Sequence, residues 1–183
     1  MKLLVIGDVV GEAGIDALHG LLRRIKRDTG ADFVIVNGEN AAGNGVLPRQ
    51  ADDIFAAGAD VITLGNHVFG KQQIVPYLDS RSDVLRPANL APQSPGRGWG
   101  IYDGPQGMRL LVMNLIGRCD MKYGPDNPFL CADRYRARLT AELNEIVPAG
   151  VLYVPVRDEL PDAARDTDED GLRILRDKAR RRS

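Results

Sequence analysis

Four short apolar runs, each followed by a polar or glycine-rich segment, mark the first half of the chain. They are Lys2–Ile6, Asp32–Val36, Asp60–Leu64 and the shorter Asp83–Leu85. None shows the strict alternation of a strand with one face in water. Continuous apolar runs of this length are typical of parallel strands buried on both faces. We therefore expect a buried strand at each of them.

Helical patterns separate these runs. Apolar residues recur at helical spacing from Ile15 to Ile25, opposite a basic face, and Gly30 is expected to end this helix. Pro48–Ala57 predicts a second helix that opens on a proline, and Gln72–Leu78 predicts a short third one. Strands and helices that alternate in this way predict an α/β fold with a parallel sheet and right-handed crossovers.

The second half of the chain carries weaker patterns. Residues 86–107 are rich in proline and glycine and predict a long ordered loop. A strand is expected over Met108–Leu115, with Gly100–Tyr102 as its partner. A helix over Pro128–Ile146 and a further strand at Val151–Val154 follow.

We expect one domain over residues 1–156 and a charged, flexible tail over residues 157–183. The tail holds eight acidic and eight basic residues, which is typical of a solvated segment. A short helix over Leu172–Ala179 is the one element expected within it.

Composition restricts the classes of function. Hydrophobic residues make up 44% and charged residues 27% of 183 positions, which is normal for a soluble globular protein. The formal net charge of -1 gives no reason to expect binding to double-stranded nucleic acid or to an anionic membrane. No apolar run approaches the roughly 20 residues that cross a bilayer, and no signal peptide is recognisable. Two cysteines, Cys119 and Cys131, do not make a disulfide framework, so we expect a cytoplasmic protein with reduced thiols.

Polar side chains of metal-binding type follow the first three predicted strands. They are Asp8, then Glu39 and Asn40, then Asn66 and His67. Ligands of parallel α/β sheets bind beyond the carboxyl ends of the strands, so these five residues are expected to meet at one rim. Carboxylates can bridge two cations about 3.5–4 Å apart, and amide oxygens complete such a site without adding charge. An adjacent imidazole is a candidate general acid.

Each of these residues alone has a simpler explanation. Asp8 could cap the following helix, Asn66 could serve a turn, and His67 could be a half-buried histidine with satisfied hydrogen bonds. Their joint occurrence after three successive strands favours a site. For His19, within the first predicted helix, we expect a structural role. Gly7–Gly14 lacks the GxGxxG spacing of a dinucleotide-binding turn.

Seven motifs occur in order between Met1 and about Ile146. They are Gly7–Gly11, Asn37–Gly43, Gly65–His67, Arg86–Asn89, Pro95–Gly98, Asn114–Arg118 and Asp126–Phe129. Together they resemble the YmdB-type bacterial metallophosphoesterases, which belong to the calcineurin-like superfamily and include 2',3'-cyclic-nucleotide 2'-phosphodiesterases.

The resemblance implies an α/β sandwich of sheets flanked by helices and a hydrolase that acts on small phosphodiesters such as 2',3'-cyclic nucleotides. It also implies two divalent metal ions, iron or manganese. Asp8, Glu39 and Asn40 would hold the first metal, Glu39 would bridge, Asn66 would hold the second metal, and His67 would donate a proton.

The chain departs from the family in its later part. The family continues with an Asp-Phe-His-Ala-Glu segment and a Thr-His-Thr-His segment that supply three more histidine ligands, whereas His19 and His67 are the only histidines here. We therefore expect a truncated or frame-disrupted member whose sandwich is incomplete at the C-terminus and which holds as few as one metal. An incomplete sheet exposes an edge and apolar surface, which predicts a homo-oligomer.

Three hypotheses follow. The first is an active metal-dependent phosphodiesterase, and the alternative is a catalytically impaired remnant that binds a single metal, a nucleotide or a protein partner. A nucleotide-binding domain of Rossmann type is third, because its glycine fingerprint is absent.

Overall fold

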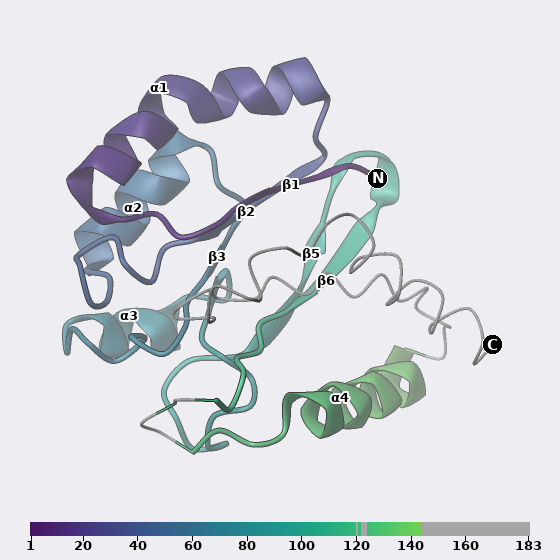
Figure 1. The fold of residues 1–183 in the computed structure, drawn as a ribbon. Helices are drawn as coiled ribbons and strands as arrows, with labels where there is room; N and C mark the ends of the chain where they lie inside the picture. Colours follow the sequence, from purple (N-terminus) through teal and green to yellow (C-terminus); the bar gives the residue numbers. More distant parts are fainter. Residues whose placement is uncertain (120, 122–123, 144–183) are drawn as a thin grey trace, which may run out of the picture.

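The N-terminal part of the chain forms a parallel sheet of four strands. A computed structural model describes residues 1–119, 121 and 124–143 (Figure 1). The strands are β1 (Leu3–Ile6), β2 (Phe33–Asn37), β3 (Val61–Thr63) and β4 (Val84–Leu85), and they pair in the order β1-β2-β3-β4. All four predicted strands are confirmed. The order of the described strands follows the chain without reversal, so this sheet lacks the switch point of a doubly wound dinucleotide-binding fold.

Three helices cover one face of this sheet. They are α1 (Gly11–Thr29), α2 (Pro48–Ala57) and α3 (Ile74–Ser80). Successive right-handed crossovers that advance in one direction place their helices on the same side. Apolar residues of the helices and of the sheet share one core, which includes Leu22, Ile54, Leu78, Val34 and Ile62. Gly30 ends α1 with a left-handed φ of 63°, as predicted.

A hairpin forms the second sheet and covers the opposite face. It consists of β5 (Trp99–Asp103) and β6 (Arg109–Met113), which pair antiparallel around the short 3-10 helix η1 (Pro105–Gly107). Alternate residues of β2 serve the two faces: Val34 packs towards the helices, and Phe33 packs towards the hairpin. This double burial is why β2 reads as an uninterrupted apolar run.

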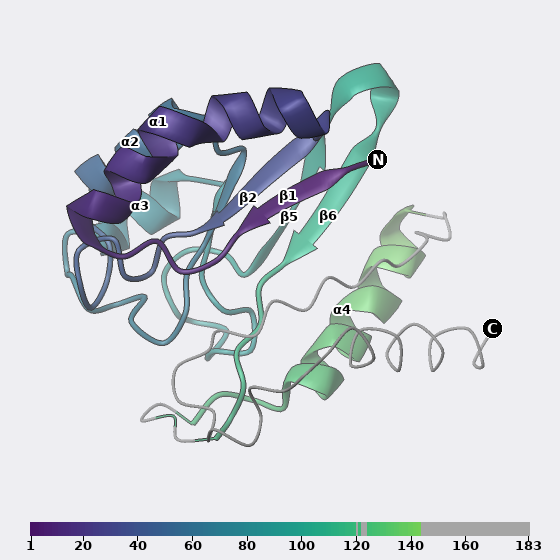
Figure 2. The ribbon, with the colours of Figure 1, turned by 45° about the horizontal axis from the view of Figure 1, so that its top comes forward.

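The helix α4 (Pro128–Leu143) lies on the far side of the hairpin. Figures 1 and 2 show the hairpin between the parallel sheet and α4. The ring centroids of Trp99 on β5 and Tyr135 on α4 are 5.9 Å apart. The layers therefore run helices, parallel sheet, hairpin, helix, which confirms the expected α/β sandwich flanked by helices. The strand predicted at Val151–Val154 and the helix predicted at Leu172–Ala179 lie outside the described residues.

One edge of the parallel sheet is formed by β1. Within the described ranges β1 pairs with β2 alone, and Leu3 on it is 37% exposed.

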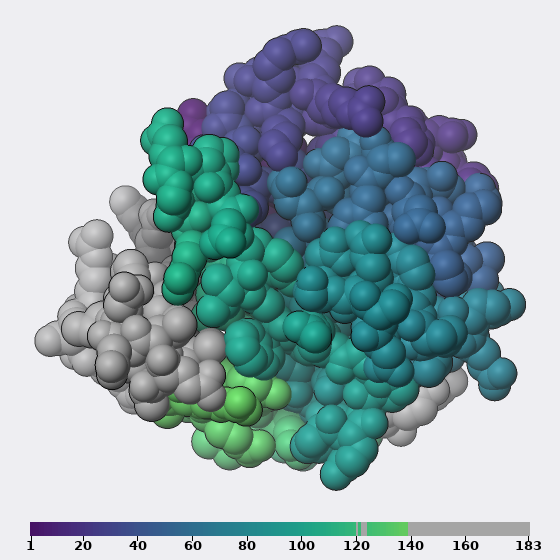
Figure 3. Space-filling model, turned by 180° about the vertical axis from the view of Figure 1, so that it is seen from behind, coloured from purple at the N-terminus to yellow at the C-terminus, as the bar shows by residue number. Residues whose placement is uncertain are grey.

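Figure 3 shows the molecule from behind, relative to Figure 1. On this side the N-terminal helices, in purple and blue, adjoin the later loops and β5, in teal. Homo-oligomerisation through an edge remains a prediction. No helix in the described part combines the length and apolar character needed to cross a bilayer.

Asp60 ties the start of β3 to two neighbouring elements. Its Oδ2 accepts hydrogen bonds from the backbone N–H of Val34, at 2.7 Å, and from Lys26 Nζ, at 2.9 Å. Val34 is fully buried. The substitution Asp60→Ala is therefore expected to lower the free energy of unfolding by about 1–3 kcal/mol, because a buried N–H loses its acceptor. Chemical denaturation measures this loss.

The matched control is Asp28→Ala. Asp28 makes only exposed ion pairs, with Arg24 at 3.5 Å and Arg27 at 3.4 Å. Its loss should cost less than about 1 kcal/mol. Equal costs for the two substitutions would contradict the assigned role of Asp60.

Candidate metal centre

Backbone hydrogen bonds hold the loops after β1, β2 and β3 together. The N–H of Val9 donates to the carbonyl of Asn37 at 2.9 Å, and the N–H of Gly38 donates to the carbonyl of Thr63 at 3.0 Å. The carboxyl ends of three parallel strands thereby become one continuous rim. The five residues predicted from the sequence all lie on it.

Asp8 follows β1 in an uncommon backbone conformation. Its φ is 40°, in the left-handed region that residues other than glycine rarely adopt. Val10, not Asp8, is the N-cap of α1, and no side chain caps that helix end. The simpler explanation of Asp8 as a helix cap is therefore wrong. Its carboxylate Oδ1 instead accepts a hydrogen bond from Asn40 Nδ2 at 2.8 Å.

A chain of hydrogen bonds continues from Asn40 to His67 and Asn66. Asn40 Oδ1 lies 3.1 Å from His67 Nδ1, and Asn66 Nδ2 lies 3.2 Å from His67 Nε2. An imidazole whose Nε2 accepts from Asn66 carries its proton on Nδ1, which then donates to Asn40. Asn40 thus joins Asp8 to His67 through the two ends of its amide, and the ring of His67 is fixed between two asparagines.

Glu39 is the deepest member of the site. Its side chain is 0% exposed, and its backbone N–H donates to Asn37 Oδ1 at 3.2 Å in the turn after β2. The carboxylate lies against the backbone of Gly65, where an added Cβ would come within 1.6 Å of Oε2. Only glycine at position 65 leaves room for this carboxylate beneath the loop after β3.

The donor set suits a hard divalent cation. Asn66 Oδ1 is buried and accepts no hydrogen bond from the described residues. A buried polar atom of this kind requires an explanation, and an ion is one. Asp8 and Glu39 place carboxylates on the same rim, so the rim offers oxygen donors of the type that manganese, magnesium and ferrous iron accept. No group of three or more His, Cys, Asp and Glu side chains suited to a metal occurs in the described ranges.

Two buried asparagines that were not predicted as site residues hold the surrounding loops. Asn114 donates to the carbonyls of Leu64 and Leu85, at the ends of β3 and β4. Asn89 donates to the carbonyl of Ile116 at 2.8 Å and accepts from its N–H at 3.0 Å. Both residues stand in motifs recognised in the sequence, but their partners lie 27–50 residues away. Sequence spacing alone gave no indication of these contacts.

The two cysteines and a buried arginine are not among the five predicted site residues. Arg86 is 6% exposed and donates to the carbonyl of Pro87 at 2.8 Å, and burial lowers the pKa of its guanidinium. Burial also raises the pKa of the Cys131 thiol, which disfavours the reactive thiolate. Cys119 and Cys131 are both free, as expected.

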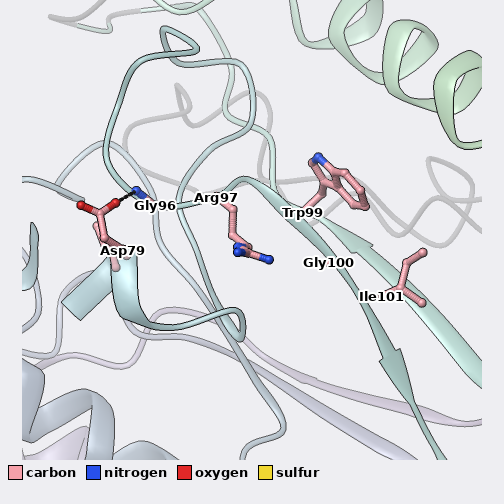
Figure 4. A pocket seen from close by; sticks show the side chains of 7 residues that line it. Asp79, Gly96, Arg97, Trp99, Gly100 and Ile101 are labelled. Atoms are coloured by element: carbon pink, nitrogen blue, oxygen red, sulfur yellow. Dashed lines mark hydrogen bonds between the residues drawn. The ribbon is translucent and has the colours of Figure 1, made fainter. Parts of the chain in front are cut away.

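Two cavities differ in their relation to the centre. The larger, of about 420 Å³, lies between α3 and β5, where Asp79 Oδ1 accepts from the Gly96 N–H and Arg97 extends from the segment before β5 (Figure 4). None of the five site residues lines it. The smaller, of about 230 Å³, has Asn66 in its wall. The smaller cavity is therefore the one joined to the candidate centre.

Comparisons with known proteins show the family to which the chain belongs. Residues 4–148 match the model of a family described as YmdB-like protein. The chain is 40% identical over 134 residues to the 2',3'-cyclic-nucleotide 2'-phosphodiesterase of Bacillus subtilis (strain 168), covering 73% of this chain and 50% of that protein.

Solved structures give the same result for the fold. A hypothetical protein from Thermus thermophilus is similar with a TM-score of 0.68 and 34% identity, over 75% of this chain and 53% of that one. A novel phosphatase from Mycoplasma pneumoniae is similar with a TM-score of 0.68 and 27% identity, over 75% of this chain and 51% of that one. The chain spans about half the length of the relatives it matches.

Proposed function

The chain belongs to the YmdB-like family of metallophosphoesterases, and from this premise we propose that it is a divalent-metal-dependent hydrolase of small phosphodiesters. The substrate we propose is a 2',3'-cyclic nucleotide, because the Bacillus subtilis relative is named for that activity. The observation that carries the proposal is the hydrogen-bonded series Asp8–Asn40–His67–Asn66, with the buried Glu39 beside it. It brings carboxylate, amide and imidazole groups from three loops to one rim.

The residues fit a metal of the hard, oxygen-preferring class. Asp8, Glu39 and Asn40 would hold a first cation, iron or manganese, Glu39 would bridge, and Asn66 would hold a second cation. When bound, such cations activate water and neutralise the negative charge that develops on the phosphate. The buried Asn66 Oδ1, which accepts no hydrogen bond from the described residues, supports this assignment.

His67 is the proposed general acid. Breaking a phosphodiester bond releases an alkoxide oxygen that must take up a proton, and the imidazolium form of a histidine, which carries a proton on Nε2 as well as on Nδ1, can supply it. Asn40 and Asn66 hold the ring of His67 on both sides, so the imidazole is oriented before the substrate arrives. Such orientation lowers the entropic cost of reaching the transition state.

A second candidate function is the binding of a single cation with impaired catalysis. It is favoured by the partial donor set, since no group of three or more His, Cys, Asp and Glu side chains in the described part is arranged for a metal. Elemental analysis of the purified chain separates the two candidates. Two metals per chain together with turnover support the hydrolase, and one metal without turnover supports the binding protein.

The substitution His67→Ala tests the proposed hydrolase. We expect the manganese-dependent hydrolysis of a 2',3'-cyclic nucleotide to fall by about 10²–10⁴-fold, because an alkoxide leaving group needs the proton. Hydrolysis of bis(4-nitrophenyl) phosphate should fall less, since nitrophenolate leaves without protonation. Steady-state kinetics on both substrates measure the difference.

His19→Ala is the matched control. His19 is the only other histidine, and it lies exposed on α1. Its replacement should leave both rates unchanged. Equal losses on the two substrates in His67→Ala would contradict a proton-donating role, and no turnover by the wild-type chain with any divalent metal would refute the proposed activity.

A further inference from the structure

The cavity of about 230 Å³ beside the candidate centre is built from three loops. Asn66 and Phe69 come from the loop after β3, Leu90 and Ser94 from the loop after β4, and Ile116 from the segment after β6. Asn66 is at once part of this cavity wall and part of the candidate metal centre. A molecule that fills the cavity therefore lies next to any phosphate held at the centre.

The lining of the cavity suits a small, weakly polar group. Phe69, Leu90 and Ile116 supply apolar surface, whereas Ser94 and Asn66 supply the few polar side chains. Binding sites for small molecules combine apolar walls with a small number of polar groups in this way. Drug-sized ligands occupy roughly 300–1,000 Å³, so a cavity of about 230 Å³ has room for a single ring system and not for a dinucleotide.

Hydrogen bonds within the protein hold the part of the cavity wall formed by the loop after β4 and by Ile116. Asn89 bonds the loop after β4 to the segment after β6 through both the carbonyl and the N–H of Ile116. A turn in which the Ser94 N–H donates to the Ala91 carbonyl at 2.9 Å shapes the rim. For this part of the wall, binding does not carry the cost of ordering a loop.

We propose that this cavity binds the nucleobase of the substrate, while the attached phosphate lies at Asn66 and the metal centre. The assignment rests on the proposed function and adds the part of the substrate that the protein recognises. It makes the chain a mononucleotide-selective enzyme, whose discrimination lies in the loops after β3, β4 and β6. The lining residues Phe69 and Leu90 contact the base, and they do not take part in the chemical step.

The test is a substitution at the rim of the cavity that fills it with a larger side chain. Ala91 lines the cavity and is exposed, so Ala91→Trp should occlude it without disturbing the core. Gln93→Trp is the matched control, because Gln93 is exposed in the same turn and does not line the cavity. Thermal unfolding of the two variants verifies that both are folded.

Binding is measured with adenosine and with ribose, neither of which carries a phosphate. Adenosine should bind the wild-type chain and Gln93→Trp alike, and at least tenfold more weakly to Ala91→Trp, in ligand-observed NMR titrations. Ribose should bind none of them. Equal binding of adenosine and ribose to the wild type, or equal binding of adenosine by the two tryptophan variants, overturns the assignment.

Hydrolysis separates this inference from the proposed function. Ala91→Trp should raise the KM for adenosine 2',3'-cyclic phosphate at least tenfold, and kcat/KM for 1-O-methylribose 2',3'-cyclic phosphate, which has no base, should stay within twofold. Cavity-dependent adenosine binding without turnover of either substrate would refute the proposed activity and leave the cavity assignment standing. Turnover of both substrates with equal losses in Ala91→Trp would overturn the cavity assignment alone.

Discussion

The substitution Glu39→Gln is expected to abolish manganese-dependent phosphodiester hydrolysis and to weaken manganese binding by more than 100-fold. Glu39 is the fully buried carboxylate of the rim. Glutamine keeps the shape of the side chain but removes its charge and one of its two equivalent oxygens, which a bridging ligand needs. Loss of a residue that hydrogen-bonds to a metal ligand costs about 10–100-fold in metal affinity, and loss of a ligand itself should cost more. Calorimetric titration with manganese measures the effect without requiring turnover.

Glu12→Gln is the matched control for this substitution. Glu12 lies exposed at the start of α1, where its carboxylate accepts hydrogen bonds from Arg49 and Gln50. The same chemical change there should leave manganese affinity and hydrolysis within twofold of the wild type. Manganese binding that survives in Glu39→Gln would remove Glu39 from the metal centre. Such a result would also undermine the donor set inferred from the rim.

The parallel sheet could be predicted because both of its faces are buried. Strands β1 to β4 appear in the sequence as apolar runs, because alternate residues pack against the helices on one face and against the hairpin on the other. Pro48 and Gly30 fix a helix start and a helix end by their backbone geometry, so α2 and the end of α1 were predicted to the residue. Elements without such markers were less well placed. The strand expected over Met108–Leu115 ends at Met113, because the side chain of Asn114 donates hydrogen bonds to the carbonyls of Leu64 and Leu85 at the ends of β3 and β4.

The placement of the candidate residues at one rim could be predicted, but not the way they contact one another. Side chains that follow successive parallel strands must meet at one rim, and this geometry made Asp8, Glu39 and Asn66 candidates. The bridge from Asp8 through Asn40 to His67 depends on loops that are 27 and 32 residues apart in the chain. No periodicity in the sequence encodes such contacts. The left-handed backbone of Asp8 was missed for the same reason, since nothing local demands it.

Close approach of two loops was the other feature hidden in the sequence. In the sequence, Gly65 before Asn66 indicates an ordinary turn. In the structure, its missing side chain leaves room for the carboxylate of Glu39 from the neighbouring loop. Likewise, Gly98 passes so near Ala88 that a Cβ would lie 2.3 Å from the Ala88 Cα. Both glycines are required by a partner far away in the chain. Only the packed structure reveals which glycines have this role.

Gly65→Ala is accordingly expected to combine a stability defect with loss of the metal centre. A Cβ at position 65 would lie 1.6 Å from Glu39 Oε2, so the carboxylate or the loop must move. Overpacking of this kind costs about 1–3 kcal/mol, and displacement of Glu39 should weaken manganese binding by more than 100-fold, as in Glu39→Gln. Denaturation and manganese titration on the same sample measure both effects.

Gly20→Ala is the control that separates this clash from the general effect of adding a methyl group. Gly20 lies within α1, and a Cβ there meets nothing within 4 Å. Alanine should raise the free energy of unfolding at this position by up to about 1 kcal/mol, because it is the better helix former, and should leave manganese binding unchanged. If Gly65→Ala bound manganese as tightly as Gly20→Ala does, the carboxylate of Glu39 could move by more than an atomic radius without loss of the ion. Glu39 would then not be a ligand held in place by the loop after β3, and the buried rim would need another explanation.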